Sequence, residues 1–390
     1  MTTIDPGTPT WLRAHNDRTA FRLLIEHGPL SRSRLGQLSG LSKPTAGQMI
    51  QRLERVGLIE PVGETSESRG PNAIVYGVRR DSMTGVAVSV LADAIEAVVT
   101  DPTDAEHPVV VIPTADLDRS PESDVTSAIE AACRAAGVPR ESVSVVVVGV
   151  QAAVDADVDE VSLTDTLPGW PLVGARSRIE AATGTTVILE NDVNLATIAE
   201  RSHGTAADAE SFAYLWMGWG VGVGVDVAGV VQRGASGSAG EIGYLSVPRA
   251  ALAYAPEAND FTDLLGPQGV IPLVGGRAGD TVEAALRQLP GSPERLEALA
   301  DRVTVAVRLI EALLDPGLVV LGGQTGIAGG DALAALVQER LDRERPETRR
   351  TRRVLEVRTS GVVAQPILRG ARRLLTAHIR DRLEETIAVG

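Results

Sequence analysis

The chain has 390 residues, a net charge of −14 and a single cysteine, Cys133. This length predicts two or three domains, and one cysteine excludes an intramolecular disulfide and a zinc site built from several cysteines. The longest apolar run, over residues 143–154, is too short to cross a bilayer, and the first residues lack the basic and apolar regions of a secretory signal. We therefore expect a cytoplasmic protein with no membrane partner.

The charge is distributed unevenly along the chain. Residues 1–80 carry 11 basic and 7 acidic side chains, whereas residues 81–390 carry 26 basic and 44 acidic ones. A basic segment attached to an acidic remainder is suited to local contact with phosphates, because the acidic part discourages nonspecific binding to nucleic acid. The only lysine in the chain, Lys43, lies in the basic segment.

Three helices are predicted in the first 60 residues. The amphipathic segment Arg18–His27 ends at Gly28-Pro29, Ser31 can cap a second helix, and Ser42 can cap a third that tolerates Pro44 in its first turn. The third helix has one apolar face, formed by Ala46, Met49, Ile50, Leu53 and Val56. Strands that begin near Gly57 and cover Ala73–Val78 then flank a polar stretch, residues 63–72, that resembles the wing of a winged helix-turn-helix.

The polar face of the third helix suits the major groove of a double-stranded DNA operator. Glutamine can pair with adenine and arginine with guanine or a phosphate, and the amides at a helix N-terminus favour phosphate. The predicted DNA-contacting residues are Ser42, Lys43, Thr45, Gln48, Gln51, Arg52, Arg55 and, in the wing, Arg69. The alternative is a three-helix protein-interaction domain, because helix-turn-helix geometry also occurs outside DNA binding.

From about Thr84 the pattern changes to alternating strands and helices. Strands are expected over Gly85–Val90, Ile95–Thr100, Val143–Val150, Val187–Leu189, Phe212–Met217, Val221–Val227 and Leu318–Leu321, and helices over Glu122–Ala136, Pro293–Leu314, Asp331–Arg343 and Gln365–Glu385. This order predicts two α/β lobes around a cleft. We therefore divide the chain into a DNA-binding domain, residues 1–80, and a two-lobed body, residues 81–390.

Four residues of the body are candidates for binding a small ligand. Asn191 and Asp192 directly follow an apolar strand, where open α/β sheets bind their ligands. Glu241 and Tyr244 lie three residues apart in a glycine-rich segment. Carboxylates and an amide that converge in a cleft can hold the hydroxyls of a polyol. Taken singly, Asp192 could instead cap a helix and Glu241 could be a solvated loop residue.

The order of these segments resembles the ROK family of repressors and sugar kinases, most closely its actinobacterial regulators. The matching stretches are 30–56, 167–172, 190–194, 217–224, 240–244 and 314–323. The resemblance implies a two-lobed, actin-like sugar-kinase fold behind a winged helix-turn-helix. It also implies a homodimer or homotetramer that binds an operator and a sugar or sugar-phosphate effector.

In the family's kinases the residue that matches Asp192 is the catalytic base, and those that match Asn191 and Glu241 hold other sugar hydroxyls. Three departures bear on catalysis. The phosphate-binding Asp-Gly-Gly-Thr loop is replaced by Leu91–Ala94, and Trp219 stands in the second phosphate turn. Tyr244 stands where the family has a zinc-binding histidine, and residues 248–263 contain no cysteine. We therefore expect no kinase activity, no metal and no cofactor, with Asp263 a weak candidate for a lost sugar-binding acid.

Three functions are compatible with this pattern. The first is a transcriptional repressor of carbohydrate metabolism that senses a sugar through a catalytically degenerate body. The second is an ATP-dependent sugar kinase with an accessory DNA-binding domain, although phosphoryl transfer depends on the positioning and charge neutralisation that the lost loop would supply. The third is a DNA-binding protein whose body binds no ligand and serves only for dimerisation.

Overall fold

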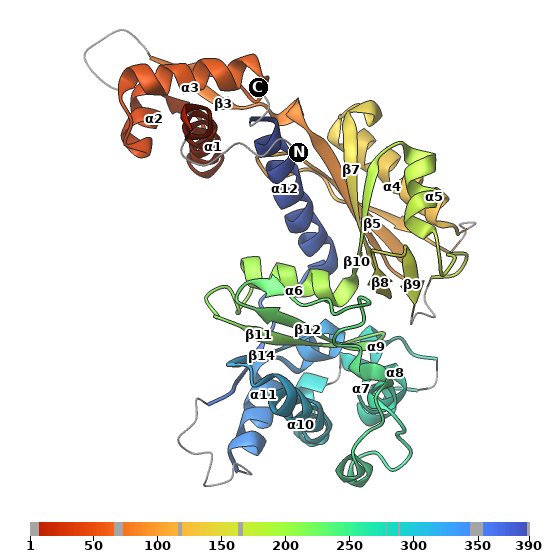
Figure 1. Cartoon of the computed structure of the whole chain (residues 1–390). Coiled ribbons are helices and arrows are strands. Elements are labelled where there is room, and N and C mark those ends of the chain that lie inside the picture. The colour runs from red at the N-terminus through yellow and green to blue at the C-terminus, as the bar shows by residue number, and fades with distance from the viewer. Residues whose placement is uncertain are drawn as a thin grey trace.

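The computed structural model describes residues 8–65, 73–115, 119–162, 167–277, 279–287, 289–343 and 354–387. Most of the predicted wing, including Arg69, lies outside the described residues. Figure 1 shows a small N-terminal unit at the upper left, a first lobe at the upper right and a second lobe below them. In the part of the chain that the structure describes, no helix is long and apolar enough to cross a membrane.

The N-terminal unit is built from three helices and a small antiparallel sheet. The helices are α1 (Pro9–His27), α2 (Arg32–Ser39) and α3 (Lys43–Arg55), and the strands pair in the order β1 (Leu30–Ser31), β3 (Ala73–Val78), β2 (Ile59–Thr65). The predicted caps are confirmed: the hydroxyls of Ser31 and Ser42 accept hydrogen bonds from the amides of Arg34 and Thr45, at 3.2 and 3.4 Å. The first helix begins nine residues earlier than predicted, because Thr8 caps it and Pro9 suits its first turn.

The first lobe contains a five-stranded sheet. Its order is β10 (Thr186–Asn191), β7 (Val143–Val150), β4 (Thr84–Val90), β5 (Ala94–Thr100), β6 (Val110–Pro113). The strands β4, β7 and β10 are parallel, whereas β5 and β6 run antiparallel to their neighbours. One apolar face packs on α4 (Pro121–Ala136) and α5 (Ala175–Thr183). A short hairpin, β8 (Ala153–Asp155) and β9 (Glu160–Ser162), follows β7.

The second lobe repeats this strand arrangement. Its order is β15 (Glu356–Thr359), β14 (Leu318–Gly322), β11 (Phe212–Met217), β12 (Val221–Val227), β13 (Val230–Val231), with parallel pairing from β15 to β11 and antiparallel pairing beyond. The helices on one face are α7 (Phe261–Leu265), α8 (Pro267–Leu273), α9 (Val282–Leu286), α10 (Pro293–Leu314) and α11 (Gly323–Arg343). The last of these begins eight residues before the predicted helix and is interrupted at Gly330, whose φ is 57°.

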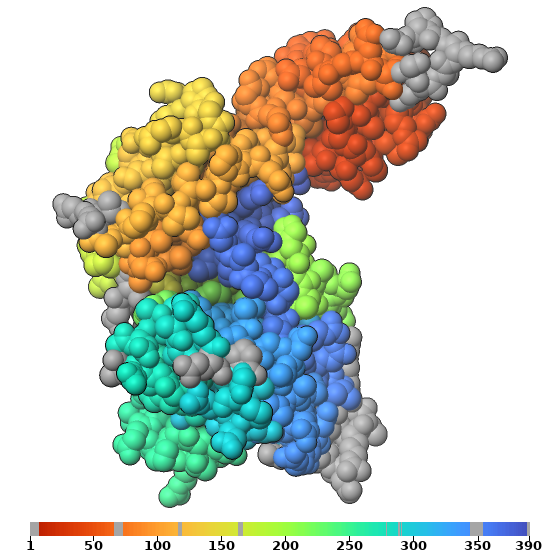
Figure 2. Space-filling view, turned by 180° about the vertical axis from the view of Figure 1, so that it is seen from behind, coloured from red at the N-terminus to blue at the C-terminus, as the bar shows by residue number. Residues whose placement is uncertain are grey.

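Two helices join the three parts of the molecule. The helix α6 (Asp192–His203) leaves the first sheet and packs on α12 (Pro366–Ile387), which extends from the region between the lobes to the N-terminal unit (Figure 1). At Gly370 the two helices are so close that a Cβ atom would overlap the backbone carbonyl of Leu195. The view from behind shows the blue surface of α12 between the upper and lower parts (Figure 2).

The far end of α12 holds the N-terminal unit through an ion pair. The guanidinium of Arg22 donates two hydrogen bonds to the carboxylate of Glu384, at 2.7 and 2.6 Å, and Arg18 donates to the Glu384 carbonyl at 3.2 Å. Apolar residues of α1 and α12 also belong to one buried core cluster. The helix α12 therefore contacts both the lobes and the N-terminal unit.

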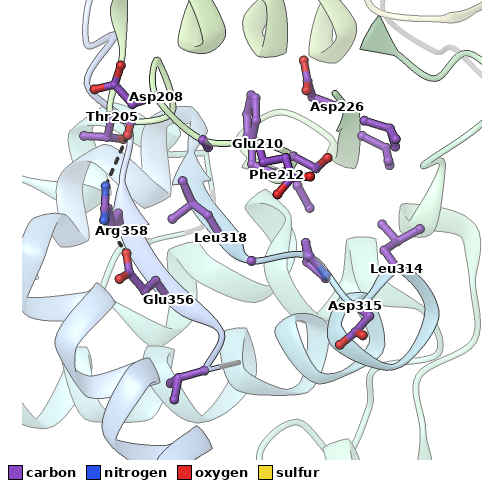
Figure 3. A pocket seen from close by; sticks show the side chains of 18 residues that line it. Thr205, Asp208, Glu210, Phe212, Asp226, Leu314, Asp315, Leu318, Glu356 and Arg358 are labelled. Atoms are coloured by element: carbon purple, nitrogen blue, oxygen red, sulfur yellow. Dashed lines mark hydrogen bonds and ion pairs between the residues drawn. The ribbon is translucent and has the colours of Figure 1, made fainter. Parts of the chain in front are cut away.

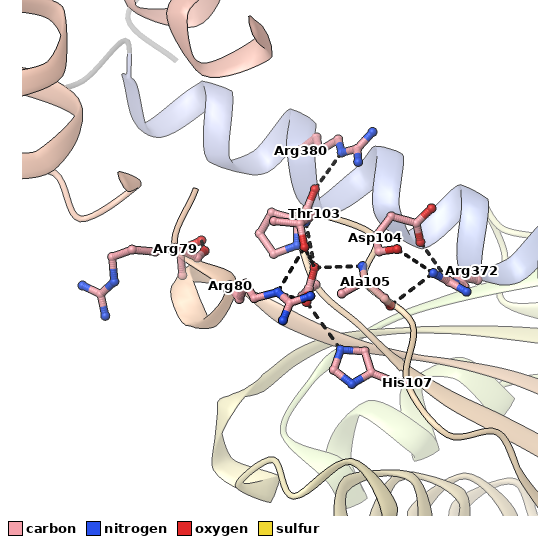
Figure 4. A network of polar contacts seen from close by, with 11 residues as sticks. Arg79, Arg80, Thr103, Asp104, Ala105, His107, Arg372 and Arg380 are labelled. Carbon is pink, nitrogen blue, oxygen red and sulfur yellow. Dashed lines mark hydrogen bonds and ion pairs between the residues drawn. The ribbon is translucent and has the colours of Figure 1, made fainter. Parts of the chain in front are cut away.

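A loop of the first lobe adds polar contacts between the domain linker and α12 (Figure 4). Arg80, in the linker, lies 3.4 Å from the buried carboxylate of Asp101. Arg372 of α12 pairs with Asp104 at 2.7 Å, and Arg380 donates to the carbonyl of Pro102 at 2.8 Å. The loop thus ties the connection after the N-terminal unit to the same helix that carries Glu384.

Candidate functional site

The exposed face of α3 carries most of the predicted DNA-contacting residues. Its other face, which includes Ala46, Met49, Ile50 and Leu53, is completely buried, as predicted. Val56 is different: it is 39% exposed, because the helix ends there. The exposed residues are Ser42, Lys43, Gln48, Gln51 and Arg55, with Thr45 half-buried beside them. A single exposed helical face is the geometry that a major-groove reader requires.

Arg52 lies on the flank of that face and is held by an ion pair within the protein, so its role as a DNA contact stays a prediction. Its guanidinium donates two hydrogen bonds of 2.7 Å to the carboxylate of Asp17 on α1, which is 5% exposed. These hydrogen bonds raise the pKa of Arg52. The pair fixes α3 against α1, a contact that the helical periodicity of α3 alone does not reveal.

The four predicted ligand-binding residues line one cavity of about 260 Å³ between the lobes. Asn191 and Asp192 lie at the junction of β10 and α6, and Glu241 and Tyr244 come from a 3₁₀ turn after β13. The remaining lining residues are Gln151, Ala152, Val193, Trp216, Trp219, Gly220, Val221, Gly222, Asp260, Thr262, Asp263 and Gln268. We call this cavity the polar cleft.

Asn191 both caps a helix and lines the polar cleft. Its Oδ1 accepts from the Asn194 amide at 3.0 Å, and its Nδ2 donates to the Ala152 carbonyl at 2.9 Å. The amide group keeps one N–H and one lone pair for another partner. The cap of α6 is therefore Asn191 rather than Asp192, which leaves the Asp192 carboxylate available to the cleft.

Asp192 is a buried carboxylate and Glu241 a half-buried one, and both have unusual proton affinity. Burial raises the pKa of Asp192 to about 7, and the negative charge of Glu241 acts in the same direction. The amide of Val193, which donates to Asp192 at 2.8 Å, and the side chain of Gln151 act in the opposite direction. Burial also raises the pKa of Glu241. Groups with such shifts are typical of ligand-binding and catalytic sites.

The ligand-free protein is expected to lose stability, relative to Asp192→Asn, as the pH rises from about 4 to 7. A raised pKa in the folded state means that folding favours the protonated carboxyl. The stability that Asp192 contributes is therefore fully present at pH values below its pKa in the unfolded chain. It is lost as the pH rises through its pKa in the folded protein. The difference in unfolding free energy between the two proteins should change by on the order of 4 kcal/mol at most. Urea unfolding of both proteins at several pH values measures it, and a difference that is independent of pH would contradict the assignment.

Three supporting residues were not predicted. Glu190 is buried, lies 2.6 Å from Arg233, and accepts from the Asn194 side chain at 2.9 Å, so it holds the start of α6. Gly240 has a φ of 85°, and a Cβ there would overlap the Val223 carbonyl, so only glycine lets the turn place Glu241 in the cleft. Gln151 could have been found, because it follows the buried strand β7 at the same sheet edge as Asn191.

The two turns that the family resemblance aligns with phosphate-binding turns have well-defined geometry. The connection from β4 to β5 has only three residues, 91–93, and closes with a 2.9 Å hydrogen bond from the Leu91 amide to the Ala94 carbonyl. On the opposite lobe Trp219, which is 42% exposed, stands at the tip of the β11–β12 turn.

The zinc site that the family resemblance implies does not fit these residues. Tyr244 supplies a phenol rather than an imidazole, and residues 248–263 contain no cysteine. Among the described residues, no three His, Cys, Asp or Glu side chains are grouped so that they could hold a metal. The turn that carries Glu241 is instead held by protein contacts such as the 3.1 Å hydrogen bond from the Thr262 hydroxyl to the Gly243 carbonyl.

A larger cavity, about 750 Å³, lies at the opposite edge of the second sheet (Figure 3). Its lining includes five acidic residues, Asp208, Glu210, Asp226, Asp315 and Glu356, and one basic residue, Arg358. Asp226 is paired with Arg201, and Arg358 with Glu356. None of the predicted ligand-binding residues lines this cavity, so size alone does not identify the candidate site.

Known proteins match most of this architecture. The ROK family matches residues 88–261. The xylose repressor of Bacillus subtilis is 22% identical over 246 residues, which cover 63% of this chain and 63% of that protein. The chain thus spans less than two thirds of the length of that relative. The β-glucoside kinase of Listeria innocua is 42% identical over 67 residues, which cover 17% of this chain and 23% of that enzyme.

Solved structures extend the similarity to the N-terminal unit. A ROK family transcriptional regulator, described as a homologue of the E. coli Mlc protein, has a TM-score of 0.70 and 19% identity over 97% of this chain and 99% of its own. The ROK hexokinase of Thermus thermophilus has a TM-score of 0.59 and 27% identity over 77% of this chain and 99% of its own. The fold is therefore the one predicted, a sugar-kinase-like body behind a helical N-terminal region.

Proposed function

Because the chain carries a ROK family domain, we propose that it is a transcriptional repressor of carbohydrate metabolism whose operator binding responds to a sugar or sugar phosphate. The observation that carries the proposal is the combination of an exposed polar face on α3 with the polar cleft between the lobes. Relatives named xylose repressor support it.

The polar cleft suits a sugar on chemical grounds. Asp192 and Glu241 can accept hydrogen bonds from hydroxyls, and Asn191 keeps one donor and one acceptor. Trp219 offers an exposed aromatic face at the rim. A cavity of about 260 Å³ lies just below the usual range for drug-sized ligands, which is appropriate for a single sugar ring.

Contacts between helices suggest how the cleft is linked to DNA binding. The helix α6 begins at Asp192 and packs on α12, and α12 holds α1 through Glu384. A ligand that prefers one arrangement of the lobes would shift the position of the N-terminal unit, whereas equal affinity for both arrangements would shift nothing. In a homodimer or homotetramer, paired α3 helices would then fit or miss the half-sites of a near-palindromic operator.

Arg55→Ala is expected to weaken operator binding by about 1–3 kcal/mol if Arg55 reads a base. Arg55 is exposed on the reading face and lies in the last turn of α3. Electrophoretic mobility shift or fluorescence anisotropy with the operator, at a fixed salt concentration, measures the loss. Arg178→Ala, which removes an exposed arginine of the first lobe, is the matched control, and equal affinities for the two variants would contradict the proposed face.

A sugar kinase with an accessory DNA-binding domain is the second candidate. The observation that favours it is the pKa of Asp192, about 7, which suits a general base. The three-residue β4–β5 turn argues against it, because phosphoryl transfer depends on positioning and charge neutralisation. Turnover of ATP with any of a panel of hexoses would favour the kinase.

The third candidate is a DNA-binding protein whose body binds no ligand. A thermal-shift screen of sugars and sugar phosphates distinguishes it from the sugar-responsive repressor and from the kinase. A ligand that binds only the folded state must raise its stability. No shift with any member of the panel, together with intact operator binding, would leave the body as a dimerisation scaffold.

A further inference from the structure

A second cavity, of about 420 Å³, shares a wall with the polar cleft. Trp216 lines both cavities and is 7% exposed. The other residues around the second cavity are Tyr214, Glu283, Leu286, Arg287, Gly323, Gln324, Ile327, Ala328, Val362, Val363 and Pro366. We call it the apolar cavity. Because one side chain borders both spaces, the two cavities lie side by side, one on each side of Trp216.

The lining of the apolar cavity suits an aromatic group. Tyr214 and Trp216 provide two rings whose centroids lie 6.4 Å apart, and most of the remaining side chains are aliphatic. Tilted aromatic neighbours favour a further ring beside them. Gln324 adds one polar feature: its Oε1 is buried and, among the described residues, finds no hydrogen-bond partner. Such an acceptor is costly to leave unsatisfied, so a ligand with a donor here would gain affinity.

Charge argues against a polyphosphate ligand that spans the two spaces. Among the described residues, Arg287 is the only cationic side chain that lines the apolar cavity, and Glu283 lies on the same lining. The described lining of the polar cleft adds Asp192, Glu241, Asp260 and Asp263 and contains no cation. Binding of a nucleoside triphosphate depends on neutralisation of the phosphates. The ligand that fits both linings is therefore not an anion.

We propose that the two cavities form one site for a glycoside, with the sugar ring in the polar cleft and an uncharged aromatic aglycone in the apolar cavity. This inference rests on the proposed sugar-binding function and narrows its effector to a substituted sugar. The sugar hydroxyls bind the carboxylates and Asn191, and the aglycone packs on Tyr214 and Trp216. A phenolic hydroxyl on the aglycone donates to Gln324.

The test compares methyl and phenyl glycosides of glucose, galactose and xylose, in both anomers. Binding to the full chain is followed by isothermal titration and by the fluorescence of Trp216 and Trp219, which line the site. For the sugar that binds, the phenyl glycoside should bind at least about tenfold more tightly than the methyl glycoside, because its ring leaves water for an apolar surface. A hydroxyphenyl glycoside with a donor near Gln324 should bind more tightly still.

Ala328→Phe fills part of the apolar cavity and should remove the phenyl preference. Its affinity for the methyl glycoside should remain that of the unmodified protein, which also shows that the variant is folded. Gln324→Leu is the second variant: it should retain the phenyl preference and lose only the additional gain from the hydroxyphenyl group.

The outcomes separate this inference from the proposed function. Equal affinity for methyl and phenyl glycosides, or no glycoside binding at all, overturns the two-cavity site. The proposed repressor function still stands in that case if operator binding responds to a free sugar. If the protein prefers the phenyl glycoside but binds no operator, the two-cavity site is supported and the proposed repressor function is contradicted. Displacement of the phenyl glycoside by ADP at lower concentration than by phenol would overturn the assignment in favour of a nucleotide.

Discussion

Asp192→Asn is expected to reduce the affinity of the polar cleft for its sugar about 10- to 100-fold and to leave operator binding unresponsive to it. The loss corresponds to one hydrogen bond to a charged group, worth about 1.5–3 kcal/mol. The measurement is best made at pH 8, because the pKa of Asp192 is about 7 and the carboxylate is then ionised. Titration calorimetry and operator binding with and without the sugar report the two effects separately.

The substitution preserves the local fold. Asparagine keeps an oxygen that can accept the hydrogen bond from the Val193 amide, so α6 should begin as before. Asp157→Asn, on an exposed turn of the first lobe, is the matched control and should leave the response unchanged. If the Asp192→Asn protein still responds fully to its effector, the polar cleft is not the sensing site.

Gly370→Ala is expected to destabilise the protein by about 3 kcal/mol, at the upper end of the usual cost of overpacking. The new methyl group would overlap the backbone carbonyl of Leu195, and a helix backbone cannot move aside as a flexible side chain can. The helices α6 and α12 would have to separate. Denaturant unfolding measures the loss, and operator binding should become less sensitive to the sugar because the same contact links the cleft to α12.

The control for Gly370→Ala is Gly47→Ala, another glycine within a helix. A Cβ at Gly47 would meet no atom within 4 Å, so this change should stabilise the protein by up to about 1 kcal/mol through helix propensity alone. If Gly370→Ala is as stable as Gly47→Ala, the close packing of α6 on α12 is wrong.

The sequence was most informative where the signal is local. The strands β7, β11 and β12 and the helix α10 have the predicted bounds, because each is a continuous buried or amphipathic run. Ser31 and Ser42 identified two helix starts by cap chemistry. Short elements such as β6, β8 and β9 were missed, since three or four residues do not establish a period.

Contacts between distant residues could not be predicted. The helical periodicity of α3 places Arg52 in the same position whether or not an acidic residue of another helix lies nearby. Its ion pair with Asp17 is therefore visible only in the structure. Similarly, the order of motifs predicted that Asn191 and Glu241 share a cleft, but it did not indicate that the Asn191 amide also caps α6. The apolar cavity beside Trp216 is assembled from four separate stretches of chain and left no pattern in any of them.

The pairing of α1 with α12 also has a consequence for synthesis on the ribosome. Arg22 and Glu384 are 362 residues apart in the sequence. At a translation rate of about 5–20 residues per second, Glu384 is synthesised roughly 20–70 s after Arg22. During that time the helix-turn-helix depends on its own small core of Phe21, Leu35 and Met49. A nascent chain therefore presents the exposed face of α3 before the contact between α1 and α12 exists, and that contact is acquired only by chains translated through Glu384.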